Sequence, residues 1–196
     1  MHLTRLSTPL RLLATIAVAL TLVVTPAFAA SAGDSTYAKS NAPFTFHYPS
    51  SFQIAPYSGG TQLNSPTFAV ALGVTTHDYL LVQTYKLKFT VAADGSGSLN
   101  GQKIPTAQVD SIVDTTIKKL ARTAGFTKQQ PVTTGKLGTL RARVYIVAKP
   151  DGSLGSHVTV ALRGTTEYYL ACQTTPAKLD QVKAACNRVI ATFARR

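Results

Sequence analysis

Residues 140–174 read LRARVYIVAKPDGSLGSHVTVALRGTTEYYLACQT and contain three segments with the pattern of β-strands. Alternation along 140–148 and 156–163 places alternate side chains on opposite faces, as in a half-buried strand. The Pro150-Asp151-Gly152 sequence between these segments is typical of a turn. Strands joined by so short a connection pair antiparallel. This stretch therefore predicts an antiparallel sheet, with a further strand over 167–174.

Two amphipathic helices are predicted, one before and one after these strands. The first opens at Pro105 and Thr106 and ends at Gly125, and its apolar residues recur at helical spacing (Val109, Ile112, Val113, Ile117, Leu120 and Ala124). Asp110 and Asp114 lie early in this helix and suit its macrodipole, so we interpret them as dipole and salt-pair residues. The second helix covers 178–193. The resulting fold class is α+β, a largely antiparallel β-sheet flanked by helices.

The remaining segments complete one domain, predicted over 43–196. Further strands are expected at 44–49, 67–74, 79–89 and 130–136. Small polar residues over 30–42 predict a flexible lead-in. The Gly95-Ser96-Gly97-Ser98 sequence is interpreted as a flexible connector.

The N-terminus has the three parts of a signal peptide. Arg5 and Arg11 give a positive region, 12–24 is an apolar run, and Ala27-Phe28-Ala29 fits the small-residue rule for cleavage. The apolar run is shorter than the roughly 20 residues that span a bilayer. We therefore predict a cleaved signal peptide over 1–29. The mature chain is then secreted or extracytoplasmic, with no transmembrane anchor, and it can still associate with a surface.

The charge balance favours anionic partners. The chain has 20 Lys+Arg and 8 Asp+Glu, and loss of Arg5 and Arg11 with the signal leaves 18 − 8 = +10. Outside the cytoplasm, such a charge suits an anionic cell-envelope component, a glycolipid or another protein. The basic residues are scattered, which makes nucleic acid an unlikely partner. The alternative is that the charge serves solubility alone.

Cys172 and Cys186 are the only cysteines, and in an exported chain such a pair predicts a disulfide. Cys186 lies on the apolar stripe of the second helix, so it can meet Cys172 if that helix packs on that strand. Metal binding needs more ligands. No Cys-x-x-Cys or His-x-x-x-His pattern occurs, so no metal and no cofactor is predicted.

No motif for catalysis is present. The sequence lacks Gly-x-Ser-x-Gly, and the single glutamate, Glu167, cannot supply a glycosidase carboxylate pair. His77 and Asp78 are adjacent in a predicted turn, where their side chains diverge. We predict no catalytic residue.

The predicted binding face is basic and aromatic. Alternation places Arg141, Arg143 and Tyr145 on one face of 140–148, and Arg163 joins them if the hairpin register aligns the polar sets. Arginine forks bind phosphate or carboxylate. The alternative is a solvated sheet face or the polar rim of a packed helix.

Three features together resemble a known fold. They are the start Phe44-Thr45-Phe46-His47-Tyr48-Pro49, the amphipathic helix before a strand meander, and the end from Tyr168-Tyr169-Leu170-Ala171-Cys172 through Cys186 to Phe193. They resemble the PsbP-like α/β/α sandwich and, more closely, secreted actinobacterial proteins of the LpqN/LpqT type. The resemblance implies a mainly non-enzymatic envelope or secreted protein, with glycolipid handling or protein binding as roles. Those proteins are typically lipoproteins, whereas this chain has no lipobox cysteine, which puts membrane anchoring in doubt.

These observations give three hypotheses about function. The first is a secreted, non-enzymatic binding or accessory protein of the cell envelope. The second is a carrier of an amphiphile or glycolipid in an apolar cleft, which a cleft with few polar groups would favour. The third is a hydrolase with a non-standard site, which converging His, Ser and Asp side chains would favour.

Overall fold

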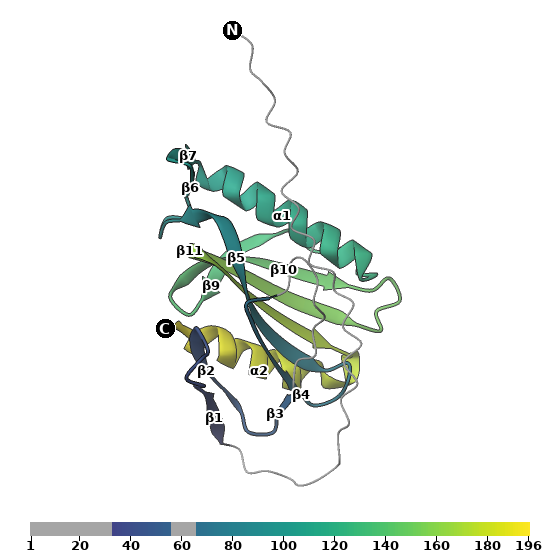
Figure 1. Ribbon diagram of the computed structural model, residues 1–196. Helices are drawn as coiled ribbons and strands as arrows, with labels where there is room; N and C mark the ends of the chain where they lie inside the picture. Colours follow the sequence, from purple (N-terminus) through teal and green to yellow (C-terminus); the bar gives the residue numbers. More distant parts are fainter. Residues whose placement is uncertain (1–32, 56–65) are drawn as a thin grey trace.

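The structure, a computed structural model, describes residues 33–55 and 66–196 (Figure 1). The predicted signal peptide, 1–29, lies outside the described residues. The elements in chain order are β1 (Asp34–Tyr37), β2 (Phe44–Pro49), β3 (Gln53–Ala55), β4 (Phe68–Gly73), β5 (Tyr79–Val91), β6 (Gly97–Leu99), β7 (Gln102–Ile104), α1 (Thr106–Thr123), β8 (Lys128–Gln129), β9 (Thr133–Leu137), β10 (Leu140–Ala148), β11 (Gly155–Thr174), a 3-10 turn (Pro176–Lys178), α2 (Leu179–Thr192) and β12 (Ala194–Arg195).

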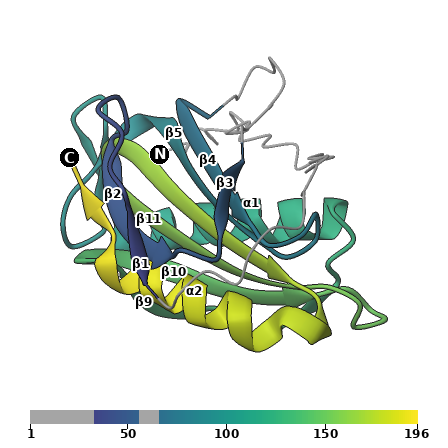
Figure 2. The same cartoon turned by 90° about the horizontal axis from the view of Figure 1, so that it is seen from below.

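Two antiparallel sheets and two helices form a sandwich. The large sheet has the strand order β3-β4-β5-β11-β10-β8, with β6 attached to β5, β7 to β6, and β9 to β10. The helices α1 and α2 lie on opposite faces of this sheet (Figure 1). A small sheet, β1-β2-β12, lies beside α2 on the same side (Figure 2). The predicted α+β fold, with a largely antiparallel sheet flanked by helices, is confirmed.

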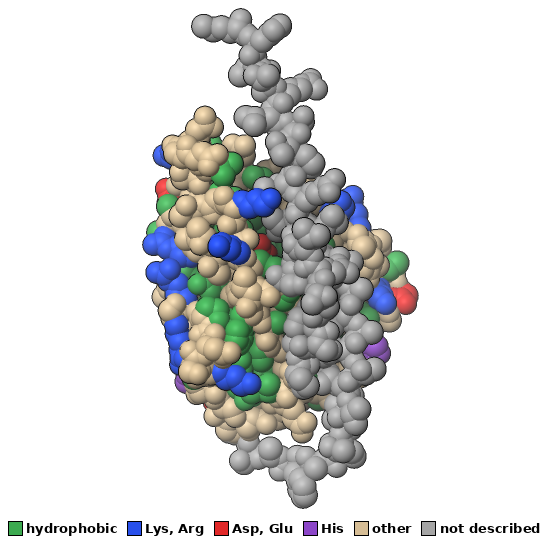
Figure 3. Space-filling view, in the orientation of Figure 1, with side chains coloured by type: hydrophobic (Ala, Val, Ile, Leu, Met, Phe, Trp, Pro, Cys, Tyr) green, Lys and Arg blue, Asp and Glu red, His purple; other side chains and the backbone are tan. Residues whose placement is uncertain are grey.

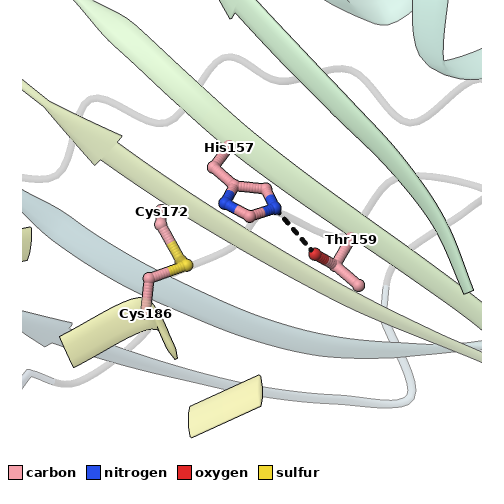
Figure 4. The surroundings of a disulfide bond; sticks show 4 residues. All are labelled: His157, Thr159, Cys172 and Cys186. Carbon is pink, nitrogen blue, oxygen red and sulfur yellow. Dashed lines mark hydrogen bonds between the residues drawn. A yellow bond between two sulfur atoms is a disulfide. The ribbon is translucent and has the colours of Figure 1, made fainter. Parts of the chain in front are cut away.

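Strand β11 reverses direction within its length. Its residues 155–161 pair with β10, its residues 166–173 pair with β5, and the register shifts between Gly164 and Thr166. A straight strand of this length would measure about 65 Å, which is longer than a domain of this size. Gly164 has φ +58°, as a tight turn requires. The two limbs of β11 are residues 155–161 and 166–173. Figure 4 shows His157 of the first limb and Cys172 of the second on neighbouring segments.

Each face of the large sheet buries its own core. The core on the α2 side is rich in aromatic rings and includes Phe44, Phe46, Leu72, Leu80, Leu170 and Val189. The core on the α1 side includes Val113, Ile117, Leu120, Tyr145, Val160 and Tyr169. The alternation of β2 buries Phe44, Phe46 and Tyr48, as its sequence predicts. Burial on both faces fixes which residues of each strand remain at the surface.

Two segments predicted to be flexible are ordered strands. Within the predicted lead-in 30–42, β1 pairs with β2, and Tyr37 is buried against Phe46. An ion pair between Asp34 and Arg188 also ties β1 to α2. Within the predicted Gly-Ser connector, Gly97 begins β6, and a Cβ there would lie 3.2 Å from side chains of Ile104 and Val109. Both predictions are wrong because composition does not reveal pairing with distant segments.

The predicted disulfide is confirmed. Cys172 on β11 is bonded to Cys186 on α2, with their Cα atoms 6.0 Å apart (Figure 4). The bond links the terminal helix to the centre of the sheet. In the part of the chain that the structure describes, no helix has the length and apolarity to cross a membrane.

Candidate functional site

The predicted basic face exists on β10, but helix α1 covers it. Arg141 donates two hydrogen bonds to the carboxylate of Asp110, at 2.8 and 2.6 Å. Arg143 donates two to Asp114, at 3.1 and 2.7 Å, and the hydroxyl of Tyr145 donates a third to Asp114, at 2.7 Å. These groups dock α1 on the sheet. The prediction that they form an open binding face is therefore wrong, whereas the alternative, a polar rim under a packed helix, is what the structure shows.

Arg163 does not join the other three residues. Ala161 belongs to the core on the α2 side, so the alternation of β11 places Arg163 on that side as well. Tyr145 belongs to the core on the α1 side. The predicted cluster is thus divided between the two faces of the sheet, because the register pairs Arg143 with Val160 rather than with a polar residue.

The electrostatics of the α1 rim suit a structural role. Burial alone would raise the pKa of Asp114, but hydrogen bonds from Arg143 and Tyr145 outweigh it and hold the pKa below its usual value. Burial, with the hydrogen bond to Asp114, raises the pKa of Tyr145 well above its ordinary range. The hydrogen bond to Asp114 also raises the pKa of Arg143. The arginines are therefore charged and already paired, which leaves little capacity for an external anion.

The remaining candidates for chemistry are also structural. Asp78 accepts hydrogen bonds from the hydroxyls of Thr75 and Thr175 and from the backbone N–H of Thr175, so it joins the turn before β5 to the end of β11. His77 is its neighbour in sequence, and the two side chains share no hydrogen bond among those described. Within 33–55 and 66–196, no cluster of His, Cys, Asp and Glu could hold a metal ion.

A different group of cations is assigned to the α2 side, and three of its four members are exposed while Arg163 is half-buried. We call Lys86, Lys88, Arg163 and Arg195 the cationic face. Lys86 and Lys88 are exposed and alternate along β5 with buried Leu87 and Phe89, which face α1. Their side chains therefore point to the opposite side of the sheet from α1.

Two members of this face, Lys86 and Arg163, lie near the Gly164 turn of β11. Lys86 is the register partner of Thr166, which follows that turn, and Arg163 precedes it. Arg195 comes from the C-terminal strand β12. Burial raises the pKa of Tyr168, and the charge of Arg195 opposes this rise, which places Arg195 within electrostatic range of the same limb.

Within residues 33–55 and 66–196, the cationic face has no ion-pair partner. Most carboxylates of the chain are engaged elsewhere, as ion-pair partners or as turn acceptors (Asp34, Asp78, Asp94, Asp110, Asp114 and Asp151). No ion pair or side-chain hydrogen bond within the described ranges involves the four cations. Figure 3 shows Lys and Arg side chains over the upper part of β5 and along the edge near the C-terminus, with few acidic groups in view.

Comparisons with known proteins support the fold. No protein-family model and no curated protein sequence matches the chain. The solution structure of cyanobacterial PsbP (CyanoP) from Synechocystis is similar, with a TM-score of 0.56 and 13% identity over 89% of this chain and 99% of that one. A crystal structure from Bacteroides thetaiotaomicron has a TM-score of 0.47 and 12% identity over 82% of this chain and 48% of that one. The chain therefore has a PsbP-like fold.

Proposed function

We propose that this protein is an exported, non-catalytic binding protein of the cell envelope, and that its cationic face binds an anionic envelope polymer. The observation that carries the proposal is the division of charge among the described residues. Most of their carboxylates are engaged inside the fold, while the cationic face has no ion-pair partner among them. Exposed cations on one face attract an extended anion over several ångströms. The resemblance to secreted proteins of the LpqN/LpqT type is consistent with this proposal and forms part of it.

Two further observations bear on the alternatives. Among the described residues, the hydroxyl of Thr159 lies 3.4 Å from Nε2 of His157, but Thr159 is fully buried, so this pair does not favour a hydrolase. Two recesses lie under α1, with cavity volumes of about 20 and 10 Å³. Each has room for about one water molecule, so neither favours a carrier of a long lipid.

The test is binding of the mature protein to immobilised polyphosphate near physiological ionic strength. Changing Lys86, Lys88 and Arg195 to Gln should weaken binding by about tenfold or more, because the cations act together on one ligand. Binding of the unchanged protein should also fall as salt rises. Surface plasmon resonance at several salt concentrations measures both effects.

The matched control removes three exposed cations from other surfaces, with Lys119, Lys128 and Lys183 changed to Gln. This variant has the same net charge as the first one, so it should keep most of the affinity. Equal losses in the two variants would show that binding depends on total charge and that there is no site. Binding to anionic lipid vesicles but not to polyphosphate would also contradict a polymer ligand.

A further inference from the structure

Strand β5 has an opening in the pairing along one of its edges. On this edge, β4 pairs with β5 as far as Thr84, and β6 pairs with it again from Thr90. Figure 1 shows β4 and β6 towards opposite ends of β5. Within 33–55 and 66–196, no strand pairs with this edge between Lys86 and Phe89. The opening therefore has a strand on each side and is about five residues, or about 17 Å, long.

The backbone groups of Lys86 and Lys88 point into this opening. The carbonyl of Thr84 accepts a hydrogen bond from the residue before β4, and the N–H of Ala92 donates one to the residue before β6. In an extended strand, every second residue directs both its N–H and its C=O to the same edge. Lys86 and Lys88 belong to the same series as Thr84 and Ala92. They therefore direct four backbone groups to an edge that no described strand covers, and such an edge can pair with another chain.

The two faces of β5 differ in character at this opening. Lys86 and Lys88 are exposed on the face away from α1. Leu87 and Phe89 lie on the other face, in a small core with Val109 of α1. Residues directly opposite each other in an antiparallel pair share a face, with Cβ atoms about 5 Å apart, and opposite charges there stabilise the pair. An added strand would therefore fit best with acidic residues opposite the two lysines and apolar residues between them.

The lysines also decide between possible partners. Lysine on a strand edge disfavours indiscriminate pairing. A second copy of the chain would bring the same two lysines opposite Lys86 and Lys88, and like charges in that position destabilise a strand pair. A strand with acidic residues gains both the backbone hydrogen bonds and the charge pairs. Since β4 and β6 both pair antiparallel with β5 on this edge, we expect the same direction for an added strand.

We propose that the open edge of β5 binds an extended segment of a partner protein in which acidic and apolar residues alternate. The segment adds to the sheet as an antiparallel strand, and its acidic residues exchange backbone hydrogen bonds with Lys86 and Lys88 while facing their side chains. This site goes beyond the proposed function, because a polyphosphate has no N–H groups and can engage the lysine charges alone. Either ligand can therefore fail to bind without excluding the other.

The test titrates the ¹⁵N-labelled mature chain with the peptide acetyl-Val-Glu-Val-Glu-Val-amide and follows the amide signals of Lys86 and Lys88. This peptide should bind at least about tenfold more tightly than Val-Lys-Val-Lys-Val or the rearranged Glu-Glu-Val-Val-Val, each with the same end groups. N-methylation of both glutamates should abolish binding, because their N–H groups face β5. N-methylation of the central valine should change the affinity by less than about threefold, because that N–H points away from β5.

Two double variants separate the charges from the backbone edge. Changing Lys86 and Lys88 to Gln should remove the preference for the acidic peptide over Val-Gln-Val-Gln-Val. Changing Lys119 and Lys183, exposed residues of α1 and α2, to Gln gives the same net charge and should leave that preference unchanged.

Three results would overturn the proposal. Equal binding of the two N-methylated peptides would show that the acidic peptide is held by charge without strand pairing. A preference for acid that survives the loss of Lys86 and Lys88 would place the binding elsewhere. Amides of these two residues that are already protected from hydrogen exchange in the free protein would show that the edge is covered.

Discussion

At the scale of single residues, the contact between Gly138 and the end of α2 is the most demanding in the fold. The N–H of Gly138 donates to the carbonyl of Ile190 at 2.7 Å. Gly138 has φ +58°, and a Cβ there would lie 1.8 Å from the carbonyl oxygen of Phe193. A side chain cannot occupy that space unless the backbone of the last helix moves.

We therefore expect Gly138→Ala to lower the free energy of unfolding by about 3 kcal/mol or more, because strain and steric overlap act together. Gly155→Ala is the control, since its nearest neighbour would be the carbonyl oxygen of Val147 at an ordinary 3.8 Å. Urea unfolding of the two variants measures the difference. Similar losses of stability in both variants would show that the close contact with Phe193 does not add to the cost of the substitution.

Residue patterns predicted the faces of strands but not the partners of side chains. Alternation placed Arg141, Arg143 and Tyr145 together correctly. Their partners Asp110 and Asp114 come from a helix about 30 residues earlier, and only the docking of that helix reveals the pairing. The cationic face had a readable signal in the alternation of Lys86 and Lys88 with Leu87 and Phe89. The position of Arg195 depends on how the C-terminal strand β12 pairs, and no local sequence pattern predicts that pairing.

At the scale of elements, the docking of α1 depends on the charge of Asp114. Because its folded pKa lies below the ordinary value of about 3.9, its contribution to stability is present above that pH and disappears as the pH falls through the folded pKa. Asp114→Asn should therefore lower the free energy of unfolding by about 2 kcal/mol at pH 7. At a pH well below the folded pKa, the variant and the unchanged protein should converge.

Denaturant unfolding at both pH values measures this difference, and Asp180→Asn gives the baseline for an exposed carboxylate. A difference for Asp114→Asn that is constant with pH would show that the carboxylate contributes by shape rather than by charge.

The disulfide between β11 and α2 should stabilise the fold chiefly by restricting the unfolded chain. The bonded residues are 14 positions apart. Cys186→Ser is expected to lower the free energy of unfolding by about 2–5 kcal/mol. Thiol labelling of the denatured, unreduced protein should find no free thiol, and two reactive thiols would contradict the bond in the mature protein.

The longer elements could be predicted because each carries its own periodicity. The predicted strands 44–49 and 140–148 coincide with β2 and β10, and α1 begins at the predicted Thr106. The short strands β1, β3, β6, β7, β8 and β12 were not predicted. They have four residues or fewer, and pairing with distant segments determines them more than their own sequence does.

At the scale of the whole molecule, the central prediction is export, because it determines the compartment in which the mature protein forms its disulfide and meets its partners. Protein recovered from the medium should begin at Ala30 or within about two residues of it, because Ala27 and Ala29 occupy the small-residue positions of the cleavage rule. N-terminal sequencing measures this directly. A membrane-bound product that retains Met1 would contradict it.

The placement of β12 has a consequence for the order of folding. Strand β2 lies between β1 and β12, and Thr45 pairs with Ala194, so an early strand of the domain depends on nearly the last residues of the chain. Contacts so distant in sequence form late, because a long loop must close first. A chain that emerges from a translocation channel with its N-terminus first would thus leave Phe44 and Phe46 of β2 without the neighbouring strand β12 until residues 194–195 arrive. The domain therefore cannot complete its fold while its C-terminal strand is still in the channel.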